Sequence, residues 1–550
     1  MLILMSYSSM LLQCNAFSFD IENNTSTMFG YSTDAPLLRS GSNGETAVDM
    51  GSGSDRYGDC IAVFGTGSDV GKSIVATALC RVFVNNGLRV SPFKAQNMSN
   101  NSGVTPEGLE MGRAQIAQAE SARIAPHVDM NPILLKPTSE IGSQVVLLGE
   151  VFADSMASAY LRRKDRLFSE ACKALDRLRA NYEIVVMEGA GSCAEVNLME
   201  SDIVNFRMAE YADAPVILVA DIHKGGVFAQ IIGTMECLSP KQRDLIIGFV
   251  INRFRGDIRL FKDGVKWIET KTGKPVFGVL PWYDHFAIES EDSVIIEAPK
   301  PVAPENIKPP AIAVIRLPHI SNFTDFEALK ALSHLHVYFL ERVQELSVFD
   351  AVILPGSKST RTDLAWLKQK GWRNQLHTYA RQGGYVWGIC GGYQMLGRRV
   401  HDPDGLEGNP GSSDGLDLLP VETILKAPKT TTLTRFSWGA NQGMGYEIHM
   451  GQTDRLGGSP LFDVFEQNGV SCRREDGCIT LNSKIAGTYI HGFFDNPSIT
   501  RQWLQLIGLG HIDIPSSYGY VAKEKAYDLL ADHFKNHVDM EKLNQILQRV

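Results

Sequence analysis

The chain has 550 residues, of which 44% are hydrophobic and 21% are charged. This length is sufficient for two or three domains, and the composition is that of an ordinary globular protein. A net charge of −9 argues against a nucleic-acid-binding protein, and no apolar run approaches the roughly 18 residues that a membrane-spanning helix needs.

Residues 1–56 differ from the rest of the chain, because residues 18–56 are rich in Ser, Gly, Asn, Thr and Asp and show no periodicity. We expect a disordered or artefactual extension there, with Met50 as a second candidate start and an atypical targeting segment as the alternative. The nine cysteines are scattered without a Cys-x-x-Cys pair, which argues against a zinc site. Their odd number favours free thiols in a reducing compartment, and so a cytoplasmic protein.

The first regular pattern is a strand at 61–64, a glycine-rich loop and a helix at 74–84. Loops of this kind hold phosphates, because glycines let the backbone approach, a lysine supplies charge and a hydroxyl can bind magnesium. Five residues, and not the common four, separate the glycines at the two ends of the pattern. The sequence therefore predicts an ATP site formed by Gly65, Thr66, Gly67, Gly71, Lys72 and Ser73.

Short apolar runs alternate with helical stretches across residues 57–296. This alternation predicts an α/β domain with a mostly parallel sheet covered by helices on both faces. Ligands of such sheets bind beyond the carboxyl ends of the strands. The predicted strands are 61–64, 90–94, 184–188, 216–220, 246–252 and 276–280.

Several polar residues follow these strands where ligands are expected. Glu188 lies beside the phosphate loop and is predicted to bind magnesium. Lys94 could contact substrate or phosphoryl oxygens, although a surface lysine explains its spacing equally well. Asp202 could orient the substrate or bind a second magnesium ion, although its spacing alone favours an ordinary loop role. Asn252 could contact adenine, and Asp221 is a further strand-end candidate.

Residues 297–310 contain five prolines and predict a stiff linker to a second α/β domain at 311–545. Within that domain, residues 401–415 read as a polar loop, and the last 40 residues contain a helical pattern. The predicted strands of this domain are 312–317, 351–354, 385–388 and 485–489.

Cys390 lies between Gly388 and Gly392, after an apolar strand and before a helical stretch. This pattern is the thiol form of a nucleophile elbow, a turn so tight that glycine is needed two positions on either side of the nucleophile. Free N–H groups at the start of the following helix favour a thiolate. The backbone N–H groups of Gly391 and of the Gly356 turn are candidates for holding an oxyanion.

A thiol nucleophile needs a base, and His491 leaves a strand into a glycine turn at the same sheet edge. His449 is the rival candidate. The chain thus carries a nucleotide site and a thiol site, and its function must use both.

Several stretches identify the chain as similar to the cobyric acid synthases, the glutamine-dependent amidases of corrin biosynthesis. The resemblance runs in order from about residue 60 to about residue 540. The stretches are SPFKAQNMSNNSGVTPEGLEMGRAQIAQAE (91–120), MNPILLKPTSEIGSQVVLLG (130–149), EGAGS (188–192), DIVN (202–205), INRFRGD (251–257), LPHISNFTDF (317–326), LPGSKSTRTDLAWL (354–367), GICGGYQMLG (388–397), GYEIHMG (445–451) and GTYIHG (487–492).

The resemblance implies a dethiobiotin-synthetase-like P-loop NTPase domain joined to a flavodoxin-like class I glutamine amidotransferase domain. It implies ATP- and glutamine-dependent amidation of the b, d, e and g carboxylates of adenosylcobyrinic acid a,c-diamide, with Mg²⁺ as cofactor. It makes Cys390 the nucleophile and His491 the base. It also places Lys72, Ser73 and Glu188 at the phosphate and metal positions, and Asn252 at the adenine.

The chain departs from the family at two places. His223 and Lys224 stand where Asp-Arg is usual, and Gly492-Phe493 follows His491 where many class I amidotransferases have His-x-Glu, so the third triad member is unassigned. Two alternatives stay open. One is a cobyrinic acid a,c-diamide synthase, and the other is a ParA/MinD-like ATPase switch with an inactive amidotransferase module. The oligomeric state is not indicated by the sequence.

Overall fold

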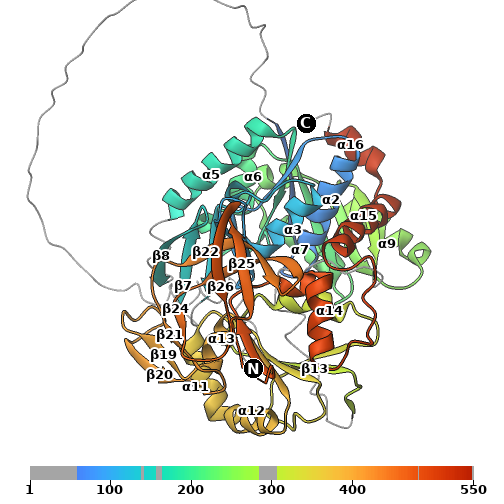
Figure 1. The fold of residues 1–550 in the computed structure, drawn as a ribbon. Coiled ribbons are helices and arrows are strands. Elements are labelled where there is room, and N and C mark those ends of the chain that lie inside the picture. Colours follow the sequence, from blue (N-terminus) through green and yellow to red (C-terminus); the bar gives the residue numbers. More distant parts are fainter. Residues whose placement is uncertain (1–57, 138–141, 157–163, 284–305, 481, 548–550) are drawn as a thin grey trace, which may run out of the picture.

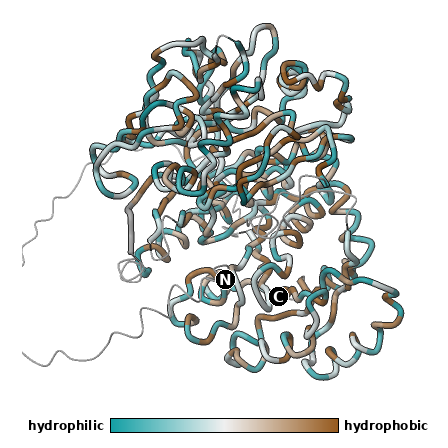
Figure 2. Tube along the Cα trace, turned by 90° about the horizontal axis from the view of Figure 1, so that it is seen from below, coloured by the Kyte–Doolittle hydropathy of each residue, from teal (hydrophilic) through white to brown (hydrophobic). Residues whose placement is uncertain are grey.

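The computed structural model describes residues 58–137, 142–156, 164–283, 306–480 and 482–547 (Figure 1). The predicted extension at 1–56 lies outside the described residues, as do residues 297–305 of the predicted linker. Hydrophobic residues recur along the whole traced fold (Figure 2). Buried apolar residues form one cluster in the N-terminal part and another in the C-terminal part, so each part has a core of its own.

The N-terminal part is built on a six-stranded sheet in the order β12-β11-β10-β1-β9-β2. All five pairings in this sheet are parallel, and the strands are almost wholly buried, as expected for a sheet covered on both faces. All six predicted strands are confirmed. Their bounds are β1 (Asp59–Gly65), β2 (Val90–Phe93), β9 (Ile184–Glu188), β10 (Val216–Asp221), β11 (Ile246–Phe254) and β12 (Val276–Pro281).

The predicted helix after the glycine-rich loop is α2 (Lys72–Asn85). It begins directly after Gly71, whose φ of 98° lies in the left-handed region. A side chain at Gly71 would also collide with the Asn252 amide, so only glycine fits there. The other helices of this part are α3 (Arg113–Ser121), α5 (Lys164–Asn181), α6 (Phe206–Ala212), α7 (Val227–Cys237), α8 (Pro240–Leu245) and α9 (Lys262–Thr272).

The expectation that helices fill every gap between strands is wrong between β2 and β9. Much of that stretch forms a small sheet in the order β3-β6-β7-β8 and a separate β4-β5 pair. A two-residue turn at Leu148 and Gly149, both with positive φ, joins β7 to β8 as a tight hairpin. The strands are β3 (Gln96–Met98), β4 (Ser102–Val104), β5 (Glu110–Gly112), β6 (Ile133–Pro137), β7 (Gly142–Leu147) and β8 (Glu150–Met156).

The C-terminal part contains a second six-stranded sheet, in the order β15-β13-β16-β18-β28-β27. Five of its strands are parallel and β27 is antiparallel. The four predicted strands are confirmed, whereas β15 was not predicted. The elements are β13 (Ala311–Ile315), β15 (His336–Leu340), β16 (Ala351–Leu354), β18 (Tyr385–Ile389), β27 (Cys478–Ile479) and β28 (Ile485–Thr488), with α10 (Glu327–Lys330), α11 (Thr360–Lys370), α12 (Trp372–Arg381), α13 (Gly391–Leu396) and α14 (Pro497–Leu506).

Two further four-stranded sheets lie between β18 and β28 in the chain. The prediction of a polar loop at 401–415 is wrong at both its ends, where β19 and β20 pair in antiparallel fashion. Backbone pairing forms this hairpin although the exposed β20 has no apolar side chain. The strands are β19 (Arg399–Asp402), β20 (Gly411–Asp414), β21 (Val421–Ile424) and β24 (Gln452–Arg455) in one sheet, and β22 (Thr430–Trp438), β23 (Asn441–His449), β25 (Phe462–Gln467) and β26 (Val470–Asp476) in the other.

The helical pattern near the end of the chain is confirmed as α15 (Tyr520–His537) and α16 (Met540–Leu547). These helices fold back onto the N-terminal part, where α15 lies beside α2 (Figure 1). Leu530 and Phe534 share one apolar core with Ile61 and Val63 of β1. The two parts of the chain are therefore joined by packing as well as by the connection before β13.

A buried ion cluster also joins the two parts. Lys136 Nζ and Lys429 Nζ each lie 2.6 Å from a carboxylate oxygen of Glu110, and the Ser102 hydroxyl donates to the same carboxylate at 2.7 Å. Burial raises the pKa of Glu110, but the two lysines outweigh it and hold that pKa well below its usual range. Glu110 is therefore ionised, and it attracts a lysine from each part of the chain.

We expect Glu110→Gln to lower the free energy of unfolding by about 3 kcal/mol, because two buried ammonium groups lose their counter-charge. Urea denaturation followed by circular dichroism measures this change. Glu107→Gln, at an exposed position in the turn between β4 and β5, is the matched control and should unfold like the wild type. Equal midpoints for both variants would contradict a stabilising role for the cluster.

Candidate active sites

Cys390 lies at the turn between β18 and α13. Its φ of 51° is rare for a residue with a side chain, and such strain is typical of a nucleophile elbow. A Cβ on Gly388 would come within 2.6 Å of the Tyr393 nitrogen, and one on Gly392 within 2.1 Å of the Leu354 oxygen. The predicted need for glycine on both sides of Cys390 is therefore confirmed.

The structure brings His491 to the Cys390 thiol and supplies a third residue, Asp325. His491 Nδ1 lies 2.7 Å from Asp325 Oδ2, and the Gly492 amide donates to Asp325 Oδ1 at 2.9 Å. The Tyr446 ring stacks on the imidazole at 5.3 Å between centroids. His491 Nε2 is buried and has no hydrogen bond within the described structure, so it is available to exchange a proton with the thiol.

The protonation of His491 follows from its surroundings. Burial lowers the pKa of the imidazole, but the Asp325 carboxylate and the Cys390 side chain outweigh burial and raise that pKa to about 10. The imidazolium is thus the stable form at neutral pH, and it is lost only as the pH rises toward 10. Cys390, His491 and Asp325 together have the groups needed for attack by a thiolate and protonation of a leaving amine.

The sequence does not point to Asp325. It lies far along the chain from residue 493, where a His-x-Glu motif beginning at His491 would place the acid. It lies on the short helical turn η6 (Phe323–Phe326), within the quoted stretch 317–326. The signal that the sequence does offer is an acidic residue between two phenylalanines, Phe323 and Phe326.

The two predicted oxyanion glycines lie next to this constellation. A Cβ on Gly356 would be 3.1 Å from His491 Cε1, and one on Gly391 would be 2.9 Å from the Ser357 nitrogen. The Gly356–Ser357 turn (β17) therefore packs against both the elbow and the imidazole. Their role as oxyanion donors stays a prediction.

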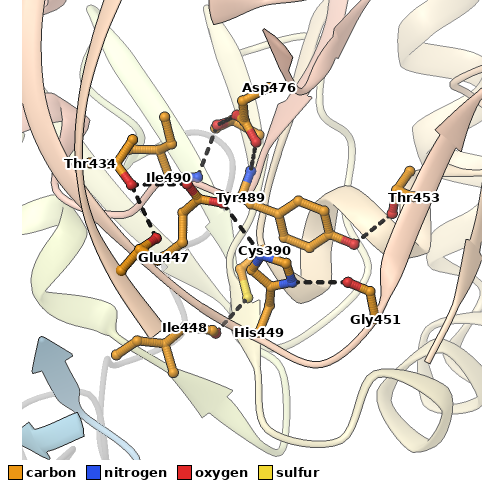
Figure 3. A network of polar contacts seen from close by, with 12 residues as sticks. Cys390, Thr434, Glu447, Ile448, His449, Gly451, Thr453, Asp476, Tyr489 and Ile490 are labelled. Carbon is orange, nitrogen blue, oxygen red and sulfur yellow. Dashed lines mark hydrogen bonds and ion pairs between the residues drawn. The ribbon is translucent and has the colours of Figure 1, made fainter. Parts of the chain in front are cut away.

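The rival histidine is held by other partners. His449 Nδ1 lies 3.1 Å from the Gly451 oxygen, its Nε2 lies 3.4 Å from Glu447, and its ring stacks on Tyr489 at 3.7 Å between centroids. Figure 3 shows this network, in which Cys390 Sγ contacts the Ile448 oxygen at 3.5 Å. The ring of His449 is therefore engaged with Gly451, Glu447 and Tyr489. His491 fits the role of the base better.

The glycine-rich loop connects β1 to α2 at the carboxyl edge of the first sheet. Lys72 Nζ donates to the backbone oxygens of Gly67 and Gly191, both at 2.9 Å, which places it across the loop. The Thr66 hydroxyl contacts Gln230 at 3.3 Å. The six predicted residues thus run from the end of β1, at Gly65, through the loop to the first turn of α2, which contains Lys72 and Ser73.

Glu188 ends β9 and is the centre of a polar cluster beside this loop. Its Oε1 accepts from the Ser73 hydroxyl at 2.8 Å and from Lys94 Nζ at 2.9 Å. Gln118 of α3 donates to its Oε2. The structure therefore brings together Ser73 of the predicted phosphate loop with Lys94 and Glu188, which the sequence places at the ends of two different strands.

The oxygen atoms of Ser73 and Glu188 are hard donors of the kind that Mg²⁺ prefers, and nucleotide phosphates can complete such a shell. No group of three or more His, Cys, Asp or Glu side chains in the described part of the chain could hold a metal ion by itself. The donor set at the loop thus fits magnesium bound jointly with a nucleotide.

Asn252 contacts the loop through its amide. Its Nδ2 donates to the Val70 oxygen at 3.0 Å and its Oδ1 accepts from the Arg253 amide at 2.8 Å. Asn252 therefore braces the loop, and contact with adenine stays a prediction. Asp221, on the neighbouring strand, forms an ion pair with Arg253 at 2.9 Å.

Asp202 lines a small cavity beside the loop, together with Ser68. Its carboxylate accepts from the Val204 amide at 2.8 Å and from Asn205 Nδ2 at 2.7 Å. Burial raises the pKa of Asp202, although these hydrogen bonds act in the opposite direction. These contacts fit the turn-forming role that the spacing had favoured, and a substrate role stays a prediction.

Within the described ranges, no helix is both long enough and apolar enough to cross a membrane.

Two family models match this chain. Residues 61–294 match the CobQ/CobB/MinD/ParA nucleotide binding domain, and residues 311–499 match the CobB/CobQ-like glutamine amidotransferase domain. A cobyric acid synthase of Chlorobaculum tepidum is 49% identical over 490 residues, which cover 88% of this chain and 97% of that protein. A cobyric acid synthase of Bacteroides fragilis is 47% identical over 88% of this chain and 97% of its own length, and one of Chloroflexus aurantiacus is 44% identical over 89% and 99%.

We expect Asp325→Asn to lower kcat for glutamine hydrolysis by roughly 10²-fold to 10⁴-fold, because the imidazole loses its orienting charge. The pKa of His491 should fall from about 10, since burial then acts without the carboxylate. The alkaline limb of the kcat/KM–pH profile should therefore move to lower pH. Asp454→Asn, at an exposed site on β24, is the control. An unmoved alkaline limb in Asp325→Asn would show that Asp325 does not set the charge of His491.

Proposed function

The chain belongs to the cobyric acid synthase family, and from this premise we propose that it converts adenosylcobyrinic acid a,c-diamide to adenosylcobyric acid. It is a glutamine-hydrolysing carbon–nitrogen ligase that uses ATP. The b, d, e and g carboxylates of the corrin are the proposed acceptors. The observation that carries the proposal is the Cys390–His491–Asp325 constellation in one chain with the Ser73–Glu188 cluster.

In the amidotransferase half, the Cys390 thiolate attacks the side-chain amide carbon of glutamine. The backbone N–H groups of Gly391 and of the Gly356 turn hold the resulting oxyanion. His491 then gives its proton to the departing ammonia while Asp325 keeps the imidazole oriented. Water hydrolyses the glutamyl thioester that remains, which releases glutamate and the free thiol.

In the nucleotide half, a corrin carboxylate attacks the γ-phosphorus of ATP and gives an acyl phosphate and ADP. Lys72 and Lys94 lie where negative charge develops on the transferred group. Ser73 and Glu188 would hold magnesium, which supplies charge neutralisation at the phosphates when bound. Asn252 is proposed to lie at the adenine and Asp202 at the acceptor, since both are at the loop edge of the sheet.

The two halves act together to form one amide bond. A carboxylate is a poor electrophile, so it is made reactive as an acyl phosphate, and ammonia displaces phosphate to form the amide. Ammonia is scarce and mostly protonated near neutral pH, so glutamine is its source. The scattered free thiols support a cytoplasmic setting for this reaction.

One of the alternatives is weakened by the geometry. A ParA/MinD-like switch with an inactive amidotransferase module has no use for a strained cysteine beside a histidine–aspartate pair. The a,c-diamide synthase differs only in the carboxylates that it amidates. The mass of the product formed from the corrin diamide distinguishes it from the proposed enzyme.

We expect Cys390→Ala to lower glutamine-dependent amidation by about 10⁴-fold or more, because no other group can form the thioester. Amidation with added ammonium salt should stay near the wild-type rate. Mass spectrometry of the corrin product measures both. Cys237→Ala, an exposed cysteine of the other half, is the control. Loss of the ammonia-dependent reaction in a folded Cys390→Ala protein would refute the division of work between the halves.

We expect Glu188→Gln to lower amidation by about 100-fold with either nitrogen source, because the metal and phosphate position loses its charge. Basal glutamine hydrolysis should persist, since Cys390 and His491 are unchanged. The exposed Glu236→Gln serves as control. If ammonia-dependent amidation by Glu188→Gln matched the wild type, Glu188 would have no part in phosphoryl transfer.

A further inference from the structure

The Gly356–Ser357 turn (β17) needs a fixed position if its backbone N–H groups are to meet an oxyanion. It packs closely against the residue after the nucleophile, since a Cβ on Gly391 would lie 2.9 Å from the Ser357 nitrogen. It also packs against the base, since a Cβ on Gly356 would lie 3.1 Å from His491 Cε1. A hydrogen-bond donor that is displaced from the oxyanion loses much of its effect on the transition state. The contacts that fix this turn are therefore important for glutamine hydrolysis.

Asp363 of α11 holds the turn through the side chain of Ser357. The Ser357 hydroxyl donates to Asp363 Oδ2 at 2.7 Å and accepts from the Ser359 amide at 3.0 Å. The Asp363 amide in turn donates to the Ser359 oxygen at 3.0 Å, within the first turn of the helix. Asp363 is wholly buried, so water does not compete for these contacts.

His319 is the second partner of the Asp363 carboxyl group. Its Nδ1 lies 2.8 Å from Asp363 Oδ1, and its backbone amide donates to Asp363 Oδ2 at 3.2 Å. The hydrogen bond to Asp363 raises the pKa of the imidazole, and burial acts in the opposite direction. Both oxygens of the carboxyl group thus have partners, which fixes the orientation of the group as well as its position.

The backbone joins the same two segments. β14 (Ile320–Ser321) pairs with β17 in antiparallel fashion, and the Lys358 amide donates to the His319 oxygen at 2.9 Å. A pair of strands only two residues long is not stable by itself. The side chains of His319 and Asp363 supply the further contacts that so short a pair needs.

This histidine–aspartate pair differs from the one at the thiol. His491 and Asp325 lie at the nucleophile, where the imidazole can exchange a proton with Cys390. His319 and Asp363 instead reach the oxyanion turn, and the Ser357 hydroxyl is the link. The C-terminal half thus contains one pair that orients the base and a second pair that contacts the candidate oxyanion donors.

We propose that His319 and Asp363 are positioning residues that hold the Gly356–Ser357 turn in the conformation in which it donates to the oxyanion. This inference rests on the proposed function, in which the oxyanion forms when Cys390 attacks glutamine. Neither residue touches the reacting atoms, and both act through the Ser357 hydroxyl and the backbone of β17. They serve the formation and breakdown of the tetrahedral intermediate, and not the generation of the thiolate.

The test compares two reactions of the Cys390 thiol in the full-length protein, with ATP and the corrin diamide present. Glutamine hydrolysis passes through an oxyanion, whereas alkylation by iodoacetamide displaces iodide without forming one. Assays of released glutamate give kcat and KM for the first reaction. Mass spectrometry of the peptide that contains Cys390 gives the rate of the second. A displaced oxyanion turn should slow the first reaction alone.

Two substitutions remove the contacts stepwise. Ser357→Ala removes the link and should lower kcat for glutamine hydrolysis by about tenfold, with KM almost unchanged. Asp363→Ala removes the partner of both side chains and should lower kcat by about 100-fold, close to the loss of a whole oxyanion donor. The rate of Cys390 alkylation should stay within about twofold of the wild type in both variants, because the thiolate is unchanged.

His319 offers a matched pair of substitutions. The amide nitrogen of asparagine can take the place of imidazole Nδ1, so His319→Asn keeps a donor for Asp363 and should retain about half of kcat or more. His319→Ala keeps no donor and should lower kcat by about tenfold. The exposed His336→Ala, on β15 of the same sheet, is the control and should behave like the wild type.

The inference is overturned if Ser357→Ala and His319→Ala hydrolyse glutamine at the wild-type rate. It is also overturned if alkylation of Cys390 slows in proportion to kcat, since the contacts would then support the elbow as a whole. A His319→Asn protein as impaired as His319→Ala would overturn the role of the imidazole donor.

Two points keep the results separate. Should Asp363→Ala not fold, Ser357→Ala and the two His319 variants decide the question. Ammonia-dependent amidation by all of these variants should equal that of the wild type, because the nucleotide half is unchanged. If the wild type itself makes no corrin amide from ammonia, the proposed function fails, and the two reactions of the thiol still decide the role of His319 and Asp363.

Discussion

The buried pair of Asp325 and His491 is the interaction on which the chemistry of the C-terminal half depends. Both side chains are almost fully excluded from water, and each is the other's hydrogen-bonded ionic partner. Parallel pairing of β13, β16, β18 and β28 brings the segments after these strands to one edge of the sheet. The sheet order therefore assembles a site from residues that are far apart in the chain.

The nucleotide half also contains a buried carboxylate that is surrounded by polar partners. Glu188 is 1% exposed, and its carboxylate is matched by Lys94, Ser73 and Gln118. A buried carboxylate without such partners would be protonated and could not hold a cation. In both halves, a buried acid near a sheet edge is paired with a buried basic side chain, His491 in one and Lys94 in the other.

The features that could be predicted from the sequence are those with a local cause. Apolar runs marked the parallel strands, and the glycines around Cys390 and in the phosphate loop marked turns that only glycine allows. Asp325 could not be predicted from spacing, because its partner His491 is reached only through the fold. The smaller sheets are also not predicted, since β20 is polar and exposed, and β22 is mostly polar and half-buried.

The return of the chain end to the N-terminal half has a consequence for ammonia transfer. Arg81 of α2 forms an ion pair with Glu524 of α15 at 3.0 Å, and the Tyr527 hydroxyl donates to Glu120 of α3 at 2.8 Å. The amidotransferase half is thus attached to the nucleotide half on both sides, before β13 and through α15. Two attachments restrict how far the halves can separate, so ammonia released in one half has a limited distance to cover to the acceptor in the other. Because α15 packs on α2 and contacts α3, the same attachment also stabilises the two helices that frame the phosphate loop and Glu188.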